Sequence, residues 1–181
     1  IILPNGLEYI SDSLFSGCKN LEEVIIPESV KYINFYAFNN CINLQEIELP
    51  QSIISVGGYA FNNTGYWNNE ANWQDGFLYL DNVLLKANEN ITEYYLPEGI
   101  TSIASYAFEN CYSLKVVEVT GSSTNIFQNT SNVELLIIKN MPLNSVAYYF
   151  GYSYYEIPVT LLKVVIKGDC DVKDSSQFAL L

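Results

Sequence analysis

The chain has 181 residues, of which 49% are hydrophobic, enough for one sizeable core of ordinary composition. Its 20 acidic residues, eight lysines and no arginine give a net charge of −12, so no basic patch can neutralise nucleic acid or bind an anionic membrane. Without histidine, the chain has no Ser-His or Cys-His catalytic pair and no histidine metal ligand.

The chain begins with repeats of one unit. Proline recurs 23 residues apart at Pro4, Pro27 and Pro50, and once more at Pro97, 47 residues beyond the third. The same apolar frame follows each proline: Leu7/Ile10, Val30/Ile33, Ile53/Val56 and Ile100/Ile103, then Leu14-Phe15, Ala37-Phe38, Ala60-Phe61 and Ala107-Phe108. A period of about 20 to 29 residues predicts a solenoid, because each coil buries its apolar side only by stacking on its neighbours.

Each unit is expected to contribute one parallel strand and an irregular return segment. In residues 21–41, Val24 and Ile26 can point inward from a short strand, which Pro27 ends because it has no N–H for the ladder. The uneven spacing of the apolar residues that follow predicts a turn-rich path with a short helical turn around 37–40. Phe38 is expected to fill the coil interior.

These residues resemble the BspA-like leucine-rich repeats of bacterial cell-surface proteins, whose unit reads roughly L-x-x-I-x-I-P-x-S-V-x-x-I-x-x-x-A-F-x-x-C. Residues 21–41, 44–64 and 91–111 carry the resemblance, with a partial copy at 3–18. It implies a leucine-rich-repeat solenoid that is displayed at the cell surface or secreted and binds other molecules. It implies no catalytic residues and no cofactor. Because the chain starts at Ile1 without a leader, we expect residues 1–181 to be a single solenoid domain from a longer protein.

An insertion at about 65–90 interrupts the period. Residues 77–80 and 83–86 are two β-rich runs joined by Asp81-Asn82, residues that accept the positive φ of a tight turn, so a β-hairpin is predicted. A polar loop with Tyr66, Trp67 and Trp73 precedes it. These aromatics, and a second cluster from Tyr148 to Tyr155, could stack on sugars or anchor a protein, but packing over an irregular coil is favoured.

The later repeats are looser. Phe127, Thr130 and Val133 restore the frame only 19 residues after Phe108, which predicts a shortened coil. Further strands are expected at 133–138 and 161–166.

A small residue follows each repeat phenylalanine by three positions: Cys18, Cys41, Thr64 and Cys111. Its side chain can donate a hydrogen bond to a carbonyl inside the turn. Equivalent positions on adjacent coils lie about 4.8 Å apart, within disulfide range, but parallel side-chain directions give poor disulfide geometry. Buried free thiols are therefore predicted at these positions.

Outward positions of the parallel strands are expected to line up along the solenoid. One such row holds Glu23, Glu46 and Glu93, and the other holds Ile25, Glu48, Tyr95, Glu118, Ile137 and Val165. The rows predict either a concave recognition face, acidic toward its N-terminal end and apolar toward its C-terminal end, or a solvated outer face with scattered apolar residues.

No enzyme, cofactor or metal is expected. Carboxylates such as Glu23 and Glu46 should stand on an open face, whereas glycosidases need their acidic pair in a cleft. Asp169, Asp171 and Asp174 have the oxygen ligands that calcium prefers but lack the glycine and distal glutamate of an EF-hand, so a polar loop is favoured. The leading hypothesis is an adhesion module for a protein partner, such as a host matrix component. The alternative is a carbohydrate-binding or spacer region of a larger secreted protein.

Overall fold

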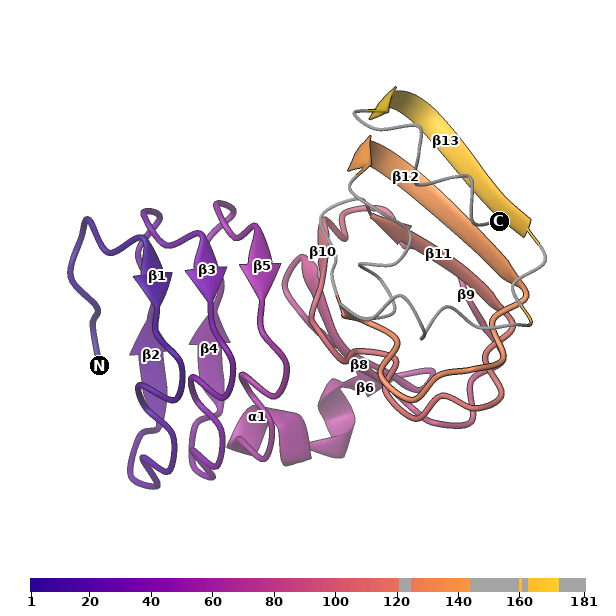
Figure 1. The fold of residues 1–181 in the computed structure, drawn as a ribbon. Coiled ribbons are helices and arrows are strands. Elements are labelled where there is room, and N and C mark those ends of the chain that lie inside the picture. Colours follow the sequence, from indigo (N-terminus) through magenta and orange to yellow (C-terminus); the bar gives the residue numbers. More distant parts are fainter. Residues whose placement is uncertain (121–124, 144–159, 161–162, 173–181) are drawn as a thin grey trace.

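The computed structural model describes residues 1–120, 125–143, 160 and 163–172. Short strands stacked side by side form the N-terminal part of the molecule, and longer strands form a sheet toward the C-terminal end (Figure 1). A short helix and a β-hairpin lie between these parts. The repeats therefore stack as coils of a parallel β-solenoid, as the period predicts.

The first coils contain two short strands each rather than the one predicted. The expected strands are β2 (Glu23–Ile25) and β4 (Glu46–Glu48), which pair in parallel. The return path adds a second parallel sheet, made of β1 (Tyr9–Ile10), β3 (Tyr32–Ile33) and β5 (Ser55–Val56). The second strands form because the inner residues Ile10, Ile33 and Val56 are all buried and hold successive coils in register.

The bends contain left-handed residues where a helical turn was predicted. Tyr36 has φ 59° and Asn40 has φ 61°, and Phe38 N between them donates to Ala60 O of the next coil at 2.7 Å. A helix would direct that N–H back to its own chain. The left-handed residues instead turn alternate N–H groups toward the neighbouring coil, so the bends also bond coil to coil.

Phenylalanine rings stack through the centre of the coils. The Phe15, Phe38 and Phe61 rings lie parallel, with successive centroids 5.2 and 5.3 Å apart. Phe108 and Phe127 stack in the same way at 5.5 Å, which confirms the shortened coil between them. Phe38 is fully buried, as predicted.

The insertion begins with a short helix, α1 (Gly65–Asn68), and a 3-10 turn, η1 (Glu70–Asn72), where a polar loop was predicted. The helix starts there because the Thr64 hydroxyl accepts a hydrogen bond from Trp67 N at 3.1 Å. The predicted hairpin follows, with β7 (Phe77–Leu80) antiparallel to β8 (Val83–Ala87) and to a short strand β6 (Trp73–Gln74). Asp81 has φ 50° in the hairpin turn, as expected of a tight turn.

Strand β8 separates two apolar cores. Val83 and Leu85 belong to the N-terminal core around Phe38, while Leu84 and Ala87 belong to the C-terminal core around Phe108. These four side chains of β8 are all buried. Both faces of this strand therefore contact apolar side chains, as in an internal strand of a layered protein.

The C-terminal sheet is parallel, in the order β13-β12-β11-β9. Its strands are β9 (Glu93–Tyr94), β11 (Val116–Thr120), β12 (Leu135–Leu143) and β13 (Lys163–Val172), and β10 (Ser102–Ile103) pairs with β8 instead. The strands predicted at 133–138 and 161–166 are confirmed, although both extend further.

The three cysteines whose side chains are described are free thiols. Cys41 is buried and donates to Phe15 O of the preceding coil at 3.0 Å, and Cys111 is buried and donates to Asn88 O at 3.6 Å. These two bonds cross between coils, whereas a bond within the turn was predicted; Thr64 makes the predicted bond, donating to Phe61 O at 2.9 Å. Cys18 is exposed, so the prediction of a buried thiol is wrong there, because no described residue packs over it as the Phe15 coil packs over Cys41.

Candidate binding surfaces

The outward side of β2 and β4 forms an acidic face, defined by Glu23, Ile25, Glu46 and Glu48. Glu23 stands directly beside Glu46, and Ile25 beside Glu48, as the alignment predicts. All four side chains are exposed, while Val24 and Ile47 between them are buried. The alternation of strand residues thus places like charges side by side in the solvent.

The N-terminal ammonium of Ile1 donates to the main-chain Glu23 O at 2.8 Å, but it forms no ion pair with the side chains of the acidic face. Among the residues that the structure describes, no lysine forms an ion pair with any of the three glutamates of this face. Glu28 adds a fourth carboxylate to the rim of a shallow groove that runs past Ile25 and Leu49. A cationic side chain approaching this groove would meet several carboxylates beside the exposed Ile25, with which Ile2, also exposed, is aligned.

The remaining predicted positions do not extend this face. Glu93 pairs with Val116 of the C-terminal sheet, and the hairpin turn lies at the end of β4, where Asp81 Oδ2 accepts from Leu49 N at 2.7 Å. Tyr95 beside β9 is 56% exposed, and the charge of Glu93 raises its pKa. The single continuous face expected from sequence is therefore interrupted, because the insertion separates the two sheets.

Two residues predicted to face the solvent are buried. Glu118, Ile137 and Val165 align across β11, β12 and β13, as predicted, but Glu118 is only 4% and Ile137 only 7% exposed. Both side chains lie on the sheet of β11, β12 and β13, where two lysines reach Glu118. Glu118 forms ion pairs with Lys139 and, at 3.5 Å, with Lys167. Neither Glu118 nor Ile137 can present a binding surface in this state, and Val165 is half-buried.

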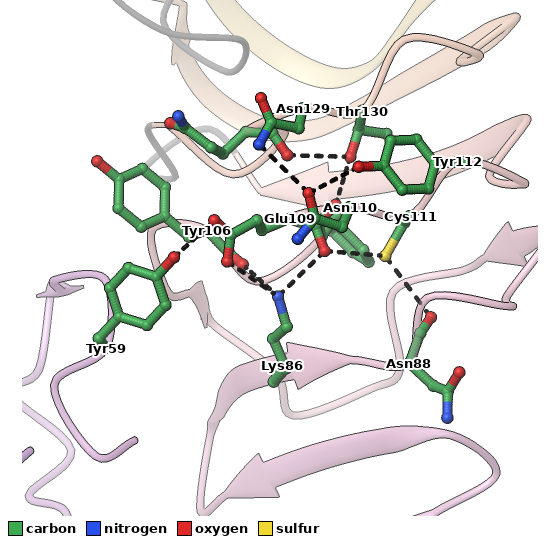
Figure 2. Close-up of polar contacts among 12 residues, drawn as sticks. Tyr59, Lys86, Asn88, Tyr106, Glu109, Asn110, Cys111, Tyr112, Asn129 and Thr130 are labelled. Carbon is green, nitrogen blue, oxygen red and sulfur yellow. Dashed lines mark hydrogen bonds and ion pairs between the residues drawn. The ribbon is translucent and has the colours of Figure 1, made fainter. Parts of the chain in front are cut away.

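A partly buried polar cluster joins the insertion to its neighbours (Figure 2). Lys86 Nζ donates to Tyr106 O at 3.2 Å and to Glu109 O at 3.1 Å, and lies 3.6 Å from Glu109 Oε2. Tyr59 OH donates to Glu109 Oε1 at 2.5 Å. Burial lowers the pKa of Lys86, and burial followed by the Glu109 hydrogen bond raises the pKa of Tyr59.

This cluster has no obvious chemistry to offer a substrate. Two of the three donors of the Lys86 ammonium are bonded to main-chain carbonyls, and the Glu109 carboxylate balances its charge at 3.6 Å. The cluster instead connects three coils through Tyr59, Lys86 and Glu109 (Figure 2).

A strip of aromatic rings, which sequence analysis missed, lies along the bends. This ring strip comprises Phe35, Tyr36, Tyr59 and Tyr106. Tyr36 and Tyr59 stack at 5.3 Å, and Tyr106 packs at an angle against Tyr59 at 5.4 Å and Phe35 at 5.7 Å. The signal was present in the sequence, since the same residue type precedes Ala-Phe at positions 36, 59 and 106.

The aromatics of the insertion pack instead of forming a free surface. Trp67 and Trp73 meet edge to face at 6.1 Å, Trp73 Nε1 donates to Trp67 O at 3.0 Å, and Tyr66 OH donates to Tyr79 O at 2.7 Å. All three rings are partly buried against the N-terminal core, so the packing interpretation is confirmed for them. The cluster from Tyr148 to Tyr155 lies outside the described residues.

The described part of the chain contains no group of three or more acidic or cysteine side chains arranged to hold a metal ion. Asp169 and Asp171 lie within β13, and Asp174 lies outside the described residues, so this run begins on a strand, where a polar loop was favoured. No described helix is long and apolar enough to cross a membrane.

Stacked coils, short parallel strands and buried phenylalanine ladders define a leucine-rich-repeat solenoid. A family model of the BspA type leucine rich repeat region matches six copies over residues 8–134, and the chain belongs to this family. No curated protein matches the chain.

The comparison with solved structures matches several bacterial repeat proteins. A leucine-rich repeat protein from Bacteroides ovatus is 22% identical, with a TM-score of 0.38, over 92% of this chain and 36% of its own. The T. pallidum leucine rich repeat protein is 20% identical, with a TM-score of 0.38, over 91% of this chain and 68% of its own. The pneumococcal vaccine antigen PcpA is 20% identical, with a TM-score of 0.39, over 92% of this chain and 46% of its own. This chain thus spans about a third to two thirds of these proteins.

Proposed function

We propose that this chain is a non-catalytic binding module of a cell-surface or secreted bacterial protein, and that it recognises a protein partner through the acidic face. The observation that supports this proposal is the alignment of Glu23 with Glu46 and of Ile25 with Glu48 on one open sheet, where none of the described lysines pairs with these glutamates. The family membership supports a repeat protein of bacterial surfaces. The negative charges of the acidic face indicate that the partner is positively charged.

Like charges directly opposite one another weaken a sheet. A partner segment rich in lysine or arginine would remove that repulsion and be drawn in by long-range attraction. Ile25, 48% exposed at the centre of the carboxylates, would supply the apolar contact that charged groups on an open face do not. The carboxylates should thus govern the rate of association and its salt dependence, and Ile25 the lifetime of the complex.

The test measures binding by surface plasmon resonance to immobilised extracellular-matrix proteins and to a lysine-rich peptide. The triple variant Glu23→Gln, Glu46→Gln, Glu48→Gln should lower the affinity at least about tenfold at low salt, a loss of about 1.4 kcal/mol. It should also flatten the salt dependence of the association rate. Ile25→Ala should mainly speed dissociation.

A matched control distinguishes an effect of the acidic face from an effect of the net charge of the protein. Glu70→Gln, Glu89→Gln and Glu98→Gln change the charge equally at three exposed positions elsewhere. Equal losses in both triple variants would show that only net charge matters. Failure of every basic target to bind would also contradict the proposal.

A further inference from the structure

The ring strip places tyrosine where the bends require a left-handed backbone. Tyr36, Tyr59 and Tyr106 have φ of 59°, 59° and 64°, a region that bulky residues avoid. Ser13 and Asn125 stand at the equivalent bends with φ of 57° and 53°. Asparagine and glycine adopt this conformation easily, so these bends do not need tyrosine to form.

Glycine makes room for the strip. A Cβ on Gly58 would lie 2.3 Å from the Tyr106 ring, so that ring can pack where it does only over a residue without a side chain. The stack ends at Tyr36, which is 41% exposed, because Ser13 takes the equivalent place in the first coil.

A small polar depression of about 110 Å³ adjoins the strip at Phe35. Its polar lining consists of two amides and two hydroxyls: Asn34, Asn125, Ser55 and Ser105. Among the described residues, none of these four side chains makes a hydrogen bond, although Ser105 is only 7% exposed. A buried hydroxyl is normally hydrogen-bonded, so that of Ser105 is available to a ligand, and the other three side chains are partly exposed beside it.

We propose that the ring strip and this depression bind an uncharged sugar ring of a glycan. The polarised C–H face of a pyranose packs on the electron-rich face of an aromatic ring. Tyr36, which follows Phe35 in the chain and is 41% exposed at the end of the stack, offers such a face. The amides and hydroxyls can donate to and accept from sugar hydroxyls. No charged side chain lines the depression, and a chain of net charge −12 repels acidic glycans, so the ligand is a neutral sugar.

This site lies on the bends after the second sheet, apart from the acidic face, and it is independent of the function proposed above. The experiment screens the intact chain on an array of glucans, mannans, galactans and N-acetylhexosamine chains beside sialylated and sulfated glycans. Isothermal titration calorimetry then measures the strongest neutral glycan. Tyr36→Asn should weaken binding at least about tenfold, yet leave the urea midpoint unchanged or higher, because asparagine tolerates the left-handed backbone.

Ser105→Ala provides a second, milder variant. It removes a hydroxyl with no partner in the described structure, so it should weaken glycan binding without lowering the urea midpoint. Tyr112→Asn is the control, since Tyr112 is 55% exposed outside the strip, and it should bind like the parent.

Absence of binding to every uncharged glycan at millimolar concentration would overturn the proposal. So would equal affinities of Tyr36→Asn and the parent, or preference for sulfated glycans or basic peptides at this site. The triple glutamine variant of the acidic face should keep its glycan affinity, which separates failure of this proposal from failure of the protein-binding one.

Discussion

Cys18, Cys41 and Cys111 occupy the same place in the repeat, yet their environments differ. Burial raises the pKa of Cys41, and raises that of Cys111 to about 11, whereas Cys18 is exposed. Thiolate is the reactive form of cysteine, and access is also required. The position in the stack therefore decides which thiol is reactive.

Cys18 should react with a thiol reagent in a fast phase at pH 8, while Cys41 and Cys111 should react only as the protein unfolds. Mass spectrometry of labelled peptides over time checks this order. Cys18→Ser should abolish the fast phase contributed by the described cysteines. Equal rates at all three sites in the native protein would contradict the coil assignment.

Lys86 and Glu109 form an ion pair in which both side chains are mostly buried, with 18% and 15% exposed. Removing one partner leaves the other charge poorly solvated. Lys86→Ala should therefore lower the free energy of unfolding by about 2 to 4 kcal/mol, discounted for the partial exposure. Urea denaturation followed by circular dichroism measures the loss.

Lys31→Ala is the matched control, because Lys31 and Glu8 form an ion pair at 3.0 Å on the surface, with both side chains about half exposed. Water already solvates both groups there, so the urea midpoint should not change measurably. A similar loss in both variants would show that burial does not distinguish the two pairs.

At the scale of elements, the bends and the phenylalanine stack hold each coil to the next. Asn62 Nδ2 donates to Asn39 Oδ1 at 3.2 Å, and Asn63 Nδ2 donates to Asn40 Oδ1 at 2.8 Å, beside the stacked rings. A coil has little interior of its own, so its stability comes from these contacts with neighbours.

Phe38→Ala should lower the free energy of unfolding by about 3 to 5 kcal/mol, as truncation of a buried aromatic does. Phe38 lies between Phe15 and Phe61, so the cavity would open on both sides. Chemical denaturation gives the value. Tyr112→Ala, at an exposed ring, should cost less than about 0.5 kcal/mol. A loss below about 1 kcal/mol for Phe38→Ala would mean that the stack carries little of the stability.

At the scale of the whole molecule, β8 connects two cores, and buried titratable groups line both. Burial raises the pKa of Tyr94, Tyr59, Cys41 and Cys111 above the values of unfolded chains. The folded protein therefore keeps protons that the unfolded chain releases above about pH 9 to 10. Where the unfolded state binds fewer protons, stability falls as pH rises.

The urea midpoint should be nearly constant at neutral pH and should fall steadily between about pH 9 and 11. The lowered pKa of Lys86 makes the protein more stable as the pH rises, but this single group is outweighed by the two tyrosines and two cysteines named above. Tyr94→Phe should reduce the alkaline fall without changing the midpoint at pH 7. A midpoint that rises through this pH range would contradict the assignment of these groups as buried.

The repeat made much of this fold predictable. The spacing of Pro27, Val30, Ile33 and Phe38 recurs in successive units, so it predicted the parallel strands and the buried rings. The β-rich runs on either side of Asp81-Asn82 predicted the hairpin where the period breaks. Such features depend on residues close in sequence, whose periodicity the chain displays directly. For the same reason the repeat spacing alone predicted the register of Glu23 with Glu46.

Only the tertiary structure decided which of these positions meet solvent. Glu118 and Ile137 occupy the predicted outward row but are buried, whereas Cys18 occupies a predicted inner position but is exposed. Exposure depends on what lies across the sheet or beyond the last coil, and residues far apart in sequence supply those contacts. The ring strip likewise depends on Gly58 and Tyr106, 48 residues apart, meeting at one bend. The repeat pattern of a solenoid determines its stacking, while its surfaces are determined by where the stack begins, ends and is interrupted.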